Sequence, residues 1–349
     1  MNLVRSVAVA LLGLAFTFPA FAEDFPVAEI TNGEIRAKIY LPDARNGFYR
    51  ATRFEWSGAI GSLQYKGHEY YGPWWGKIDP EMYNFSAKGP EVISAPFTAM
   101  VGPAEEFGTN GAALGWEEAA PGGTFIKIGV GVLRKPNNSD RYDRSKPYEI
   151  VDGGKWTVKK NRDSIEFTHS LSDPPSGYGY FYRKVVRLAK GKPQMAIEHS
   201  LRNTGKKQIV STVYNHNFLT LDKQPPGPDF VLTFPFDVQT GPRPLNPELG
   251  EVRGNQIRYR KVLENDDQLS GRITGFSDKA SDYDIRVENT KVGAGYRVTA
   301  DRPLTNVALW SIRTVLCIEP YNSMTIDPAE EFTWNLTYDY YTLDKKPTD

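Results

Sequence analysis

Two residues at the ends of apolar segments have side chains that suit acid–base chemistry. His216 ends an alternating segment, within 214–218 (YNHNF), and stands shortly before the Pro-Gly loop at 225–228. Glu319 closes the apolar run 315–318 and precedes a proline. Histidine titrates near neutral pH, and a carboxylate that ends a buried strand needs a partner or a function. We therefore treat both residues as candidate catalytic residues, with purely structural roles as the alternative.

The other histidines and the single cysteine are expected to have structural roles. His169 and His199 fall on the apolar faces of alternating segments, which predicts core positions. His68 lies in a Lys-Gly-His-Glu turn that we expect to be solvated, and Cys317 lies in an apolar run, which predicts a buried, unreactive thiol. No histidines pair at metal-ligand spacing, and the sequence has no GxSxG, P-loop, GxGxxG or HExxH motif. We expect neither a metal nor a cofactor.

The candidate residues lie on segments that alternate apolar and polar side chains with a period of two, the pattern of β-strands. Turn formers such as 152–154 (DGG) and 203–205 (NTG) separate these segments, and no segment shows a sustained helical stripe with caps. The pattern predicts an all-β domain with a sandwich or barrel-like architecture. The expected strands cover residues 34–40, 163–171, 178–189, 194–202, 207–216, 229–235, 283–288, 294–300, 305–311 and 331–342.

Residues 1–22 have the organisation of a secretory signal peptide. Arg5 is followed by an apolar run over 7–18 and by the small-x-small sequence at 20–22 (AFA). No linker or internal repeat divides the rest, so residues 23–349 are predicted to form one domain of an exported protein, periplasmic or extracellular. No later segment is long and apolar enough to span a bilayer.

The composition excludes binding that depends on bulk charge. The 349 residues include 42 Lys and Arg against 42 Asp and Glu, so the formal net charge is zero. This balance argues against a nucleic-acid binder and against a protein held at a membrane surface by charge.

The stretch 66–123, rich in Gly, Pro and aromatic residues, is predicted to form long functional loops, and 136–147 a polar surface loop.

Both candidate catalytic residues lie in segments that resemble the aldose 1-epimerase (galactose mutarotase) family. Segment 195–222 is similar to the family's strand, Asn-Thr-Gly turn and second strand, which lead into an Asn-His-x-(Tyr/Phe)-Phe-x-Leu motif. Segment 315–342 is similar to the family's apolar strand that ends in glutamate, and 46–69 to its early strands. The match covers most of the mature chain in order. It implies a large antiparallel β-supersandwich in which His216 is the catalytic acid and Glu319 the base.

The chemistry that the resemblance implies is the interconversion of sugar anomers. The base takes the proton of the anomeric hydroxyl, the acid protonates the ring oxygen, the ring opens, and closure on the other face gives the second anomer. A glutamate with an ordinary pKa of about 4.3 is ionised at neutral pH, whereas a histidine at about 6.5 needs a higher pKa to act as the acid. We expect the Glu319 charge to raise the pKa of His216.

The residues that would bind the sugar depart from the family pattern. The family's second histidine is absent from 114–118 (LGWEE), and its sugar-binding arginine segment is absent around 71–75 (YGPWW). Aromatic rings provide apolar faces for sugar C–H groups, and polar side chains fix the orientation. We therefore predict substrate binding by Trp74, Trp75, Glu118, Asn215 and Asp282, with Tyr71, Trp116, Glu117, Lys127, Arg183 and Asp284 as further candidates.

The hypothesis is an exported aldose 1-epimerase-like enzyme that acts, as a monomer or dimer, on a monosaccharide or a reducing-end sugar. Two alternatives stay open. One is a non-catalytic carbohydrate-binding protein of the same fold, because the substrate-binding residues differ from the family pattern. The other is a polysaccharide lyase or hydrolase on the same sandwich, with Tyr214 beside His216 serving β-elimination.

Overall fold

The computed structural model describes residues 25–82, 84–108, 113–138 and 141–343. The predicted signal peptide, residues 1–22, lies outside this part of the chain. Strands and two short 3₁₀ turns make up the regular structure of the described residues. In chain order they are β1 (Val27–Thr31), β2 (Ile35–Tyr40), β3 (Ala59–Tyr65), β4 (His68–Glu69), β5 (Lys77–Ile78), β6 (Phe85–Ser86), β7 (Ile93–Ser94), β8 (Gly102–Phe107), β9 (Thr124–Lys127), β10 (Gly131–Arg134), β11 (Ile150–Asp152), β12 (Lys155–Lys160), β13 (Ser164–Asp173), β14 (Tyr178–Leu188), β15 (Gln194–Asn203), β16 (Ile209–Phe218), η1 (Leu221–Lys223), β17 (Phe230–Thr233), β18 (Gln239–Thr240), β19 (Gly250–Arg253), β20 (Gln256–Tyr259), β21 (Gln268–Thr274), η2 (Ala280–Asp282), β22 (Asp284–Asn289), β23 (Ala294–Ala300), β24 (Asn306–Ile312), β25 (Val315–Ile326) and β26 (Glu331–Thr342).

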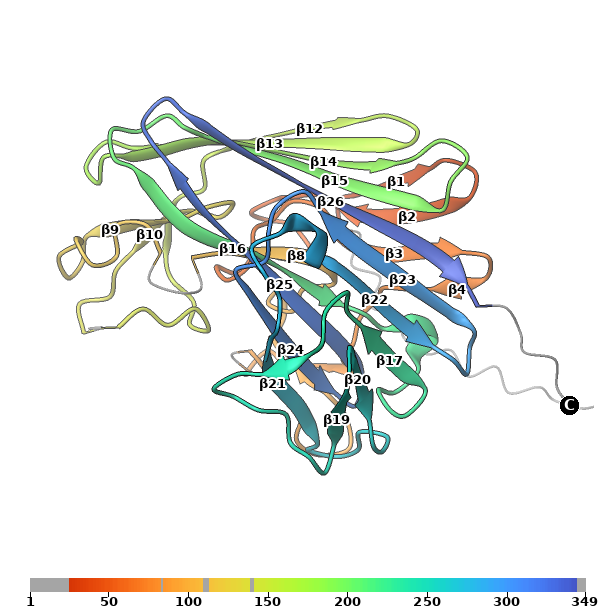
Figure 1. Ribbon diagram of the computed structural model, residues 1–349. Coiled ribbons are helices and arrows are strands. Elements are labelled where there is room, and N and C mark those ends of the chain that lie inside the picture. The colour runs from red at the N-terminus through yellow and green to blue at the C-terminus, as the bar shows by residue number, and fades with distance from the viewer. Residues whose placement is uncertain (1–24, 83, 109–112, 139–140, 344–349) are drawn as a thin grey trace, which may run out of the picture.

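Most strands belong to two large antiparallel sheets (Figure 1). The ten-stranded sheet has the order β12-β13-β14-β15-β26-β23-β22-β17-β20-β19, and the six-stranded sheet the order β18-β21-β24-β25-β16-β8. Three small sheets, β1-β2-β3-β4, β11-β10-β9 and β5-β7-β6, complete the architecture. The predicted all-β antiparallel sandwich is confirmed. No helix among the described residues is long and apolar enough to cross a membrane.

The alternating segments form strands because each can bury one of its faces. In β15, Met195, Ile197, His199 and Leu201 are buried, and the side chains between them are more exposed. The strand pairs with β14 on one side and β26 on the other, so its backbone hydrogen bonds are satisfied along both edges. The observed bounds of β15 extend the predicted strand over 194–202 by a single residue.

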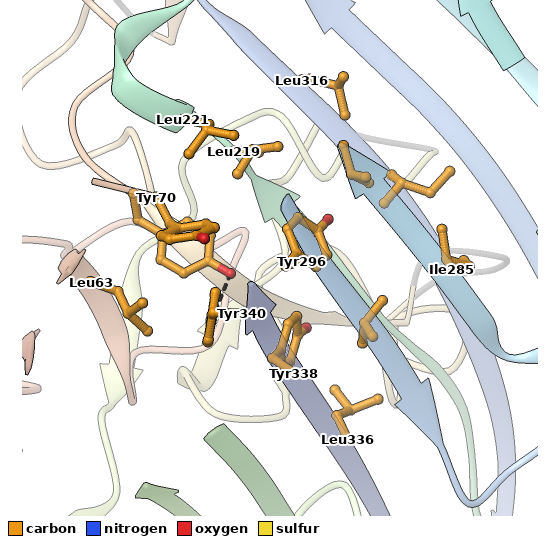
Figure 2. Close-up of a cluster of buried hydrophobic side chains, with 14 of the residues drawn as sticks. Leu63, Tyr70, Leu219, Leu221, Ile285, Tyr296, Leu316, Leu336, Tyr338 and Tyr340 are labelled. Atoms are coloured by element: carbon orange, nitrogen blue, oxygen red, sulfur yellow. Dashed lines mark hydrogen bonds between the residues drawn. The ribbon is translucent and has the colours of Figure 1, made fainter. Parts of the chain in front are cut away.

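A tyrosine-rich core joins the two large sheets (Figure 2). Tyr296, Tyr338 and Tyr340 of the ten-stranded sheet are fully buried and share one cluster with Leu316 of β25. The Tyr338 hydroxyl donates a 2.8 Å hydrogen bond to Oδ1 of Asn217 in β16, which links the ten-stranded sheet to the six-stranded sheet. Rings of this size bury a large apolar area, and a buried hydroxyl needs such a partner.

Two aromatic residues that we considered for a sugar platform are core residues instead. Tyr71 is fully buried, and its hydroxyl lies 3.0 Å from the hydroxyl of Tyr340. Trp116 is also fully buried and packs edge-on against Phe125, with 4.9 Å between ring centroids. Their apolar surface is already covered by the protein, so neither ring presents a face to a ligand.

Three of the four histidines have structural positions, as expected for two of them. His169 is buried, and this burial lowers its pKa to about 4. His199 is buried and stacks on Trp334, with 4.5 Å between ring centroids. The prediction of a solvated turn at His68 is wrong, because this residue is half-buried in β4 and its Nδ1 lies 2.7 Å from Oδ2 of Asp222.

A buried ionic cluster lies between the sheets. Lys184 of β14 contacts Glu105 of β8, and its Nζ lies 2.7 Å from Oε1 of Glu55. Nε2 of His199 and Nδ2 of Asn215 each lie 2.9 Å from Oε1 of Glu105. Burial opposes ionisation of Glu105, but the charges of Lys184 and His199 outweigh it and hold the pKa of this carboxyl well below its ordinary value. Side chains from four strands and one loop thus share a single buried charge cluster.

We predict that Lys184→Met lowers the free energy of unfolding by about 3–5 kcal/mol, because it leaves two buried carboxylates without their cation. Chemical denaturation at pH 7 measures this. The matched control is Arg187→Met on the same strand, whose exposed pair with Glu198 contributes at most about 1 kcal/mol. Equal effects of the two substitutions would contradict the assignment of a stabilising role to the buried cluster.

Candidate active site

A cleft of about 260 Å³ lies on the six-stranded sheet. Its lining comes from the strands β16, β21, β24 and β25 and from the loop segments 49–54, 98–100 and 144–147. His216 and Glu319 both line the cleft. Nε2 of His216 lies 3.2 Å from Oε1 of Glu319, so the two candidate catalytic residues converge as the sequence predicts.

Strand register explains why these two residues meet. In the antiparallel pair β16–β25, Tyr214 is opposite Tyr321, and a further bridge joins Leu219 to Leu316. Continuing this register places His216 directly opposite Glu319. Alternation places Asn217, which bonds to the ten-stranded sheet, on the other face of β16, so the cleft lies on the face turned away from that sheet.

Aromatic rings enclose the imidazole of His216. Phe218 stacks on it with 3.9 Å between centroids and 9° between planes, and Phe54 and Trp310 contact it edge-on at 5.6 Å and 5.7 Å. The exposed fraction is 3% for His216 and 6% for Glu319. Nδ1 of His216 has no hydrogen-bond partner among the described residues. The pair is therefore largely removed from water. In such a buried place, nearby charges have a strong effect on its protonation.

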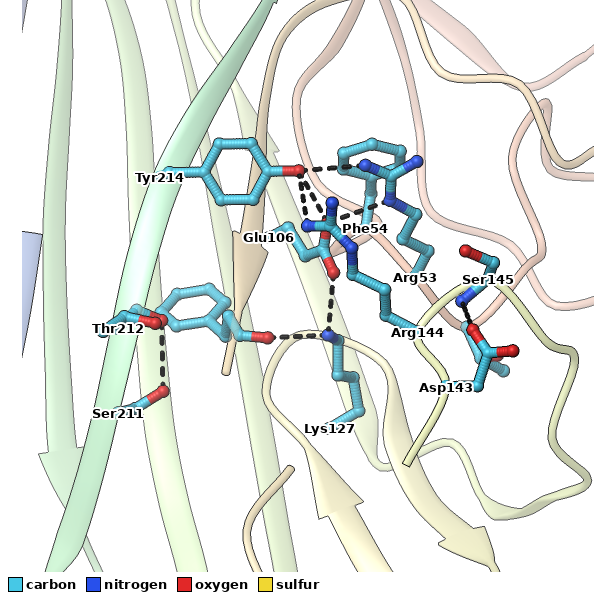
Figure 3. A network of polar contacts seen from close by, with 12 residues as sticks. Arg53, Phe54, Glu106, Lys127, Asp143, Arg144, Ser145, Ser211, Thr212 and Tyr214 are labelled. Atoms are coloured by element: carbon cyan, nitrogen blue, oxygen red, sulfur yellow. Dashed lines mark hydrogen bonds and ion pairs between the residues drawn. The ribbon is translucent and has the colours of Figure 1, made fainter. Parts of the chain in front are cut away.

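A cationic cluster forms the wall beside the pair (Figure 3). Nε of Arg53 lies 2.9 Å and Nη1 of Arg144 lies 3.2 Å from Oε2 of Glu106. The Tyr214 hydroxyl donates a 2.7 Å hydrogen bond to the same oxygen, and Nζ of Lys127 lies 3.4 Å from the other oxygen. Glu106 is fully buried, and this set of partners holds two loops against the edge strand β8.

The protonation of the pair differs from our expectation. Burial lowers the pKa of His216 well below its ordinary value, and the charges of Arg53 and Arg144 lower it further. The expected net rise in the pKa of His216 is therefore wrong, because burial and two nearby cations oppose the imidazolium. Burial raises the pKa of Glu319, although Arg53 and Arg144 partly offset this. The lowered pKa therefore favours the neutral imidazole of His216 at neutral pH.

Of the two predicted platform residues, Trp74 lines the cleft and Trp75 is absent from its lining. The Trp74 indole stacks in parallel with Phe218, at 5.8 Å between centroids, and its Nε1–H donates a 2.9 Å hydrogen bond to the carbonyl of Met100. Trp75 packs against Phe48 instead, at 6.2 Å.

The structure does not bring Glu118, Asn215 or Asp282 into the cleft lining. Glu118 is exposed and pairs with Lys207. Asn215 follows the strand alternation to the face opposite His216, where it bonds to Glu105. Asp282 accepts hydrogen bonds from the backbone and hydroxyl of Ser277 at 2.6 Å and 2.8 Å. Each side chain has a local structural partner.

The further candidates also have other positions. Lys127 belongs to the cationic cluster, and its burial lowers its pKa to about 8. Arg183 and Asp284 form ion pairs outside the cleft lining, and Glu117 is exposed. Tyr214 bonds to Glu106 beneath the lining residues. Among the described residues no group of three or more His, Cys, Asp and Glu side chains is placed to hold a metal ion.

Sequence reasoning missed the residues that give the cleft its character. Arg53, Arg144, Arg272 and Trp310 all line it, and Trp310 is half-buried with part of its surface free. The loop 136–147, which we expected to be a simple surface loop, supplies cleft residues from its C-terminal part. Arg53 has one local signal, since it lies in a dense run of aromatic residues, but the other three carry no recognisable motif.

Solved structures with the same architecture come from several organisms. The galactose mutarotase related enzyme of Lactobacillus acidophilus is 14% identical, with a TM-score of 0.50, covering 92% of this chain and 100% of that chain. A galactose mutarotase-like protein of Lactobacillus casei ATCC 334 is 12% identical, with a TM-score of 0.52, covering 90% and 100%. The GalM/aldose epimerase homologue from C. elegans is 13% identical, with a TM-score of 0.52, covering 91% and 99%.

These similarities define the architecture as galactose mutarotase-like, and at the level of the fold they confirm the resemblance found in the sequence. No family model matches the sequence, and no curated protein does either. The chain is thus a divergent protein with this fold, and its site has to be interpreted from its own residues.

We predict that Glu319→Gln stabilises the folded protein at pH 7 by about 1 kcal/mol, the usual gain from a single stabilising substitution. The raised pKa means that the folded wild type ionises Glu319 at a higher pH than the unfolded chain does. The free energy of unfolding of the wild type therefore falls as the pH rises from 4.5 through the raised pKa. The Glu319→Gln protein has no carboxyl to ionise there, so it does not lose this stability. Denaturant titrations between pH 4 and pH 8 measure the difference. A destabilised Glu319→Gln protein would contradict the prediction.

Proposed function

We propose that the protein is an exported enzyme that interconverts the anomers of a sugar by acid–base ring opening and closure. The observation that carries the proposal is the His216–Glu319 pair, 3.2 Å apart, buried in a cleft of an aldose-epimerase-like fold. One carboxylate and one imidazole are the groups that the two proton transfers require.

The placement of the two groups suits the reaction. Glu319 accepts the proton of the anomeric hydroxyl, and His216 delivers a proton to the ring oxygen. These two oxygens are bonded to the same carbon, so a base and an acid 3.2 Å apart can address both. The half-buried Trp310 supplies apolar surface for the sugar ring, and the buried Trp74 packs edge-on against it, with 5.9 Å between ring centroids. The sugar-binding arginine that the family pattern places elsewhere is supplied here by Arg53 or Arg144.

The neutral state of His216 sets a condition on this mechanism. A neutral imidazole is a weak acid, so the bound substrate must make the imidazolium form more favourable than it is in the empty cleft. Burial disfavours that form most, and the charges of Arg53 and Arg144 add to it; these two charges are the part that a bound substrate can offset directly.

We predict that His216→Asn and Glu319→Gln each lower kcat/KM for anomer exchange by about 100-fold or more, the contribution typical of a general acid or base. The double variant should lose little beyond the larger single effect, since the two groups act as a unit. Polarimetry and NMR exchange across hexoses and oligosaccharide reducing ends measure this against uncatalysed mutarotation.

His68→Gln, outside the cleft lining, is the matched control and retains activity. A double variant as active as the wild type would overturn the proposal; sugar binding without exchange would support a non-catalytic carbohydrate-binding protein.

We predict that kcat/KM falls at acidic pH with a limb above pH 4.5, because Glu319 acts as a base only when ionised and its pKa is raised. Arg144→Gln removes a charge that lowers this pKa, so the acidic limb should move to higher pH. A pH–rate profile of both proteins measures the shift. A limb that stays in place, or a wild-type rate that is constant down to pH 4.5, would contradict the assignment of Glu319 as the base.

A further inference from the structure

The cleft is more basic than the molecule as a whole. The complete chain has as many acidic as basic residues, so its formal net charge is zero. Around the cleft the balance is different, because Glu319 is the one carboxylate among the described lining residues. The cationic side chains in the same lining are Arg53, Arg144, Lys146, Arg243 and Arg272. Positive charge concentrated in a concave site attracts anions.

The inner cations exceed the carboxylates that face them. Arg53, Arg144 and Lys127 surround a single carboxylate, Glu106. Glu106 and Lys127 are buried and the two arginines are partly exposed, so the excess charge lies at the boundary of the cleft, where an anion from solvent can supply the counter-charge. Bonds within this cluster use Nε and Nη2 of Arg53 and Nη1 of Arg144. Each guanidinium has five N–H groups, so both arginines can donate further hydrogen bonds to a ligand.

Arg272 provides a second, independent observation. Its Nη1 is buried and has no hydrogen-bond partner among the described residues. The guanidinium lies over the ring of Tyr321, 5.4 Å from the centroid, and the Tyr321 hydroxyl contacts Glu319 at 3.4 Å. An unpaired guanidinium nitrogen beside the candidate base indicates that an acceptor belongs at this place.

We propose that the cleft binds a saccharide that carries an anionic group (a carboxylate, sulfate or phosphate) and that Arg53, Arg144 and Arg272 contact this group. The proposal rests on the proposed function for the orientation of the sugar. Guanidinium groups form paired, charge-assisted hydrogen bonds with such oxyanions. In a pyranose the C5 substituent is next to the ring oxygen, so an anion there lies close to His216, which would protonate that oxygen.

This arrangement also meets the condition that the mechanism sets. An anion bound at Arg53 and Arg144 offsets the two charges that disfavour the imidazolium form of His216. The charged substituent therefore does more than add binding energy, since it places a negative charge beside the group that has to accept a second proton. An anionic sugar should have a higher kcat than its neutral counterpart, in addition to a lower KM.

The test compares sugars that differ in one substituent. Calorimetry measures binding and NMR exchange measures turnover for D-galacturonate against D-galactose, D-glucose 6-phosphate against D-glucose, and D-galactose 6-sulfate against D-galactose. We expect at least one anionic sugar to bind about tenfold or more tightly than its partner at low salt, with a preference that shrinks in about 0.5 M NaCl. The pair that shows the effect distinguishes carboxylate, phosphate and sulfate.

Variants connect the preference to the arginines. Arg272→Gln should reduce the anionic-to-neutral ratio about tenfold, whereas Arg272→Lys, which keeps the charge, should retain part of it. Arg187→Gln, outside the cleft lining, is the matched control and should leave the ratio unchanged. Circular dichroism checks that each variant is folded.

The outcomes separate this proposal from the proposed function. Equal affinity for charged and neutral sugars, or a preference that Arg272→Gln does not alter, overturns the anion site even if neutral sugars are exchanged. Salt-sensitive binding of an anionic sugar without exchange supports the anion site and overturns the proposed reaction. Binding of none of these sugars overturns both.

Discussion

Two consecutive buried carboxylates on one edge strand organise the structure around the cleft. Glu105 and Glu106 of β8 point to opposite faces of the six-stranded sheet, because successive residues of a strand alternate. Glu105 meets Lys184 and His199 between the sheets, and Glu106 meets three cations beside the cleft. Neither carboxylate can stay ionised in a protein interior without such partners. The partners come from distant segments, so satisfying these two charges fixes how those segments pack.

The loops gain their order from this requirement. Arg53 and Glu55 lie two residues apart on one loop, and they contact Glu106 and Lys184 respectively. That loop is therefore tied on both faces of the sheet, with Phe54 between the two anchors and in edge contact with His216. Arg144 ties a second loop to the same carboxylate. The walls of the cleft are thus formed by segments that contain no regular structure of their own.

The same charges determine the electrostatics of the acid–base pair. Cations that stabilise Glu106 also disfavour a second proton on His216, while burial makes ionisation of Glu319 harder. Burial and these cations together favour the neutral imidazole of His216. In the proposed mechanism, an anionic substrate would change the local charge around His216, so recognition and proton transfer would be linked.

Much of the fold and the central pair could be predicted from the sequence. Strands such as β15 follow from side-chain alternation, which is a local property of the chain. His216 lies near the end of β16 and Glu319 lies inside β25, both within recognisable motifs, and their meeting follows from strand register. The expectation that Glu319 closes its strand is wrong, because β25 continues to Ile326. The neighbouring Asn215 was misplaced because the motif suggested a shared role, although alternation puts it on the other face.

The sequence by itself determined the β-strand pattern and the two residues suited to acid–base chemistry, because both depend on residue type and short spacing. Only the tertiary structure decided which loops and charges surround them. Arg53, Glu106, Arg144 and Arg272 are separated by long stretches of chain, and their positions depend on pairing buried charges across the whole molecule. Burial of His216 and the charges of Arg53 and Arg144 together lower its pKa, and the same cations give the cleft its basic character, which no local pattern encodes.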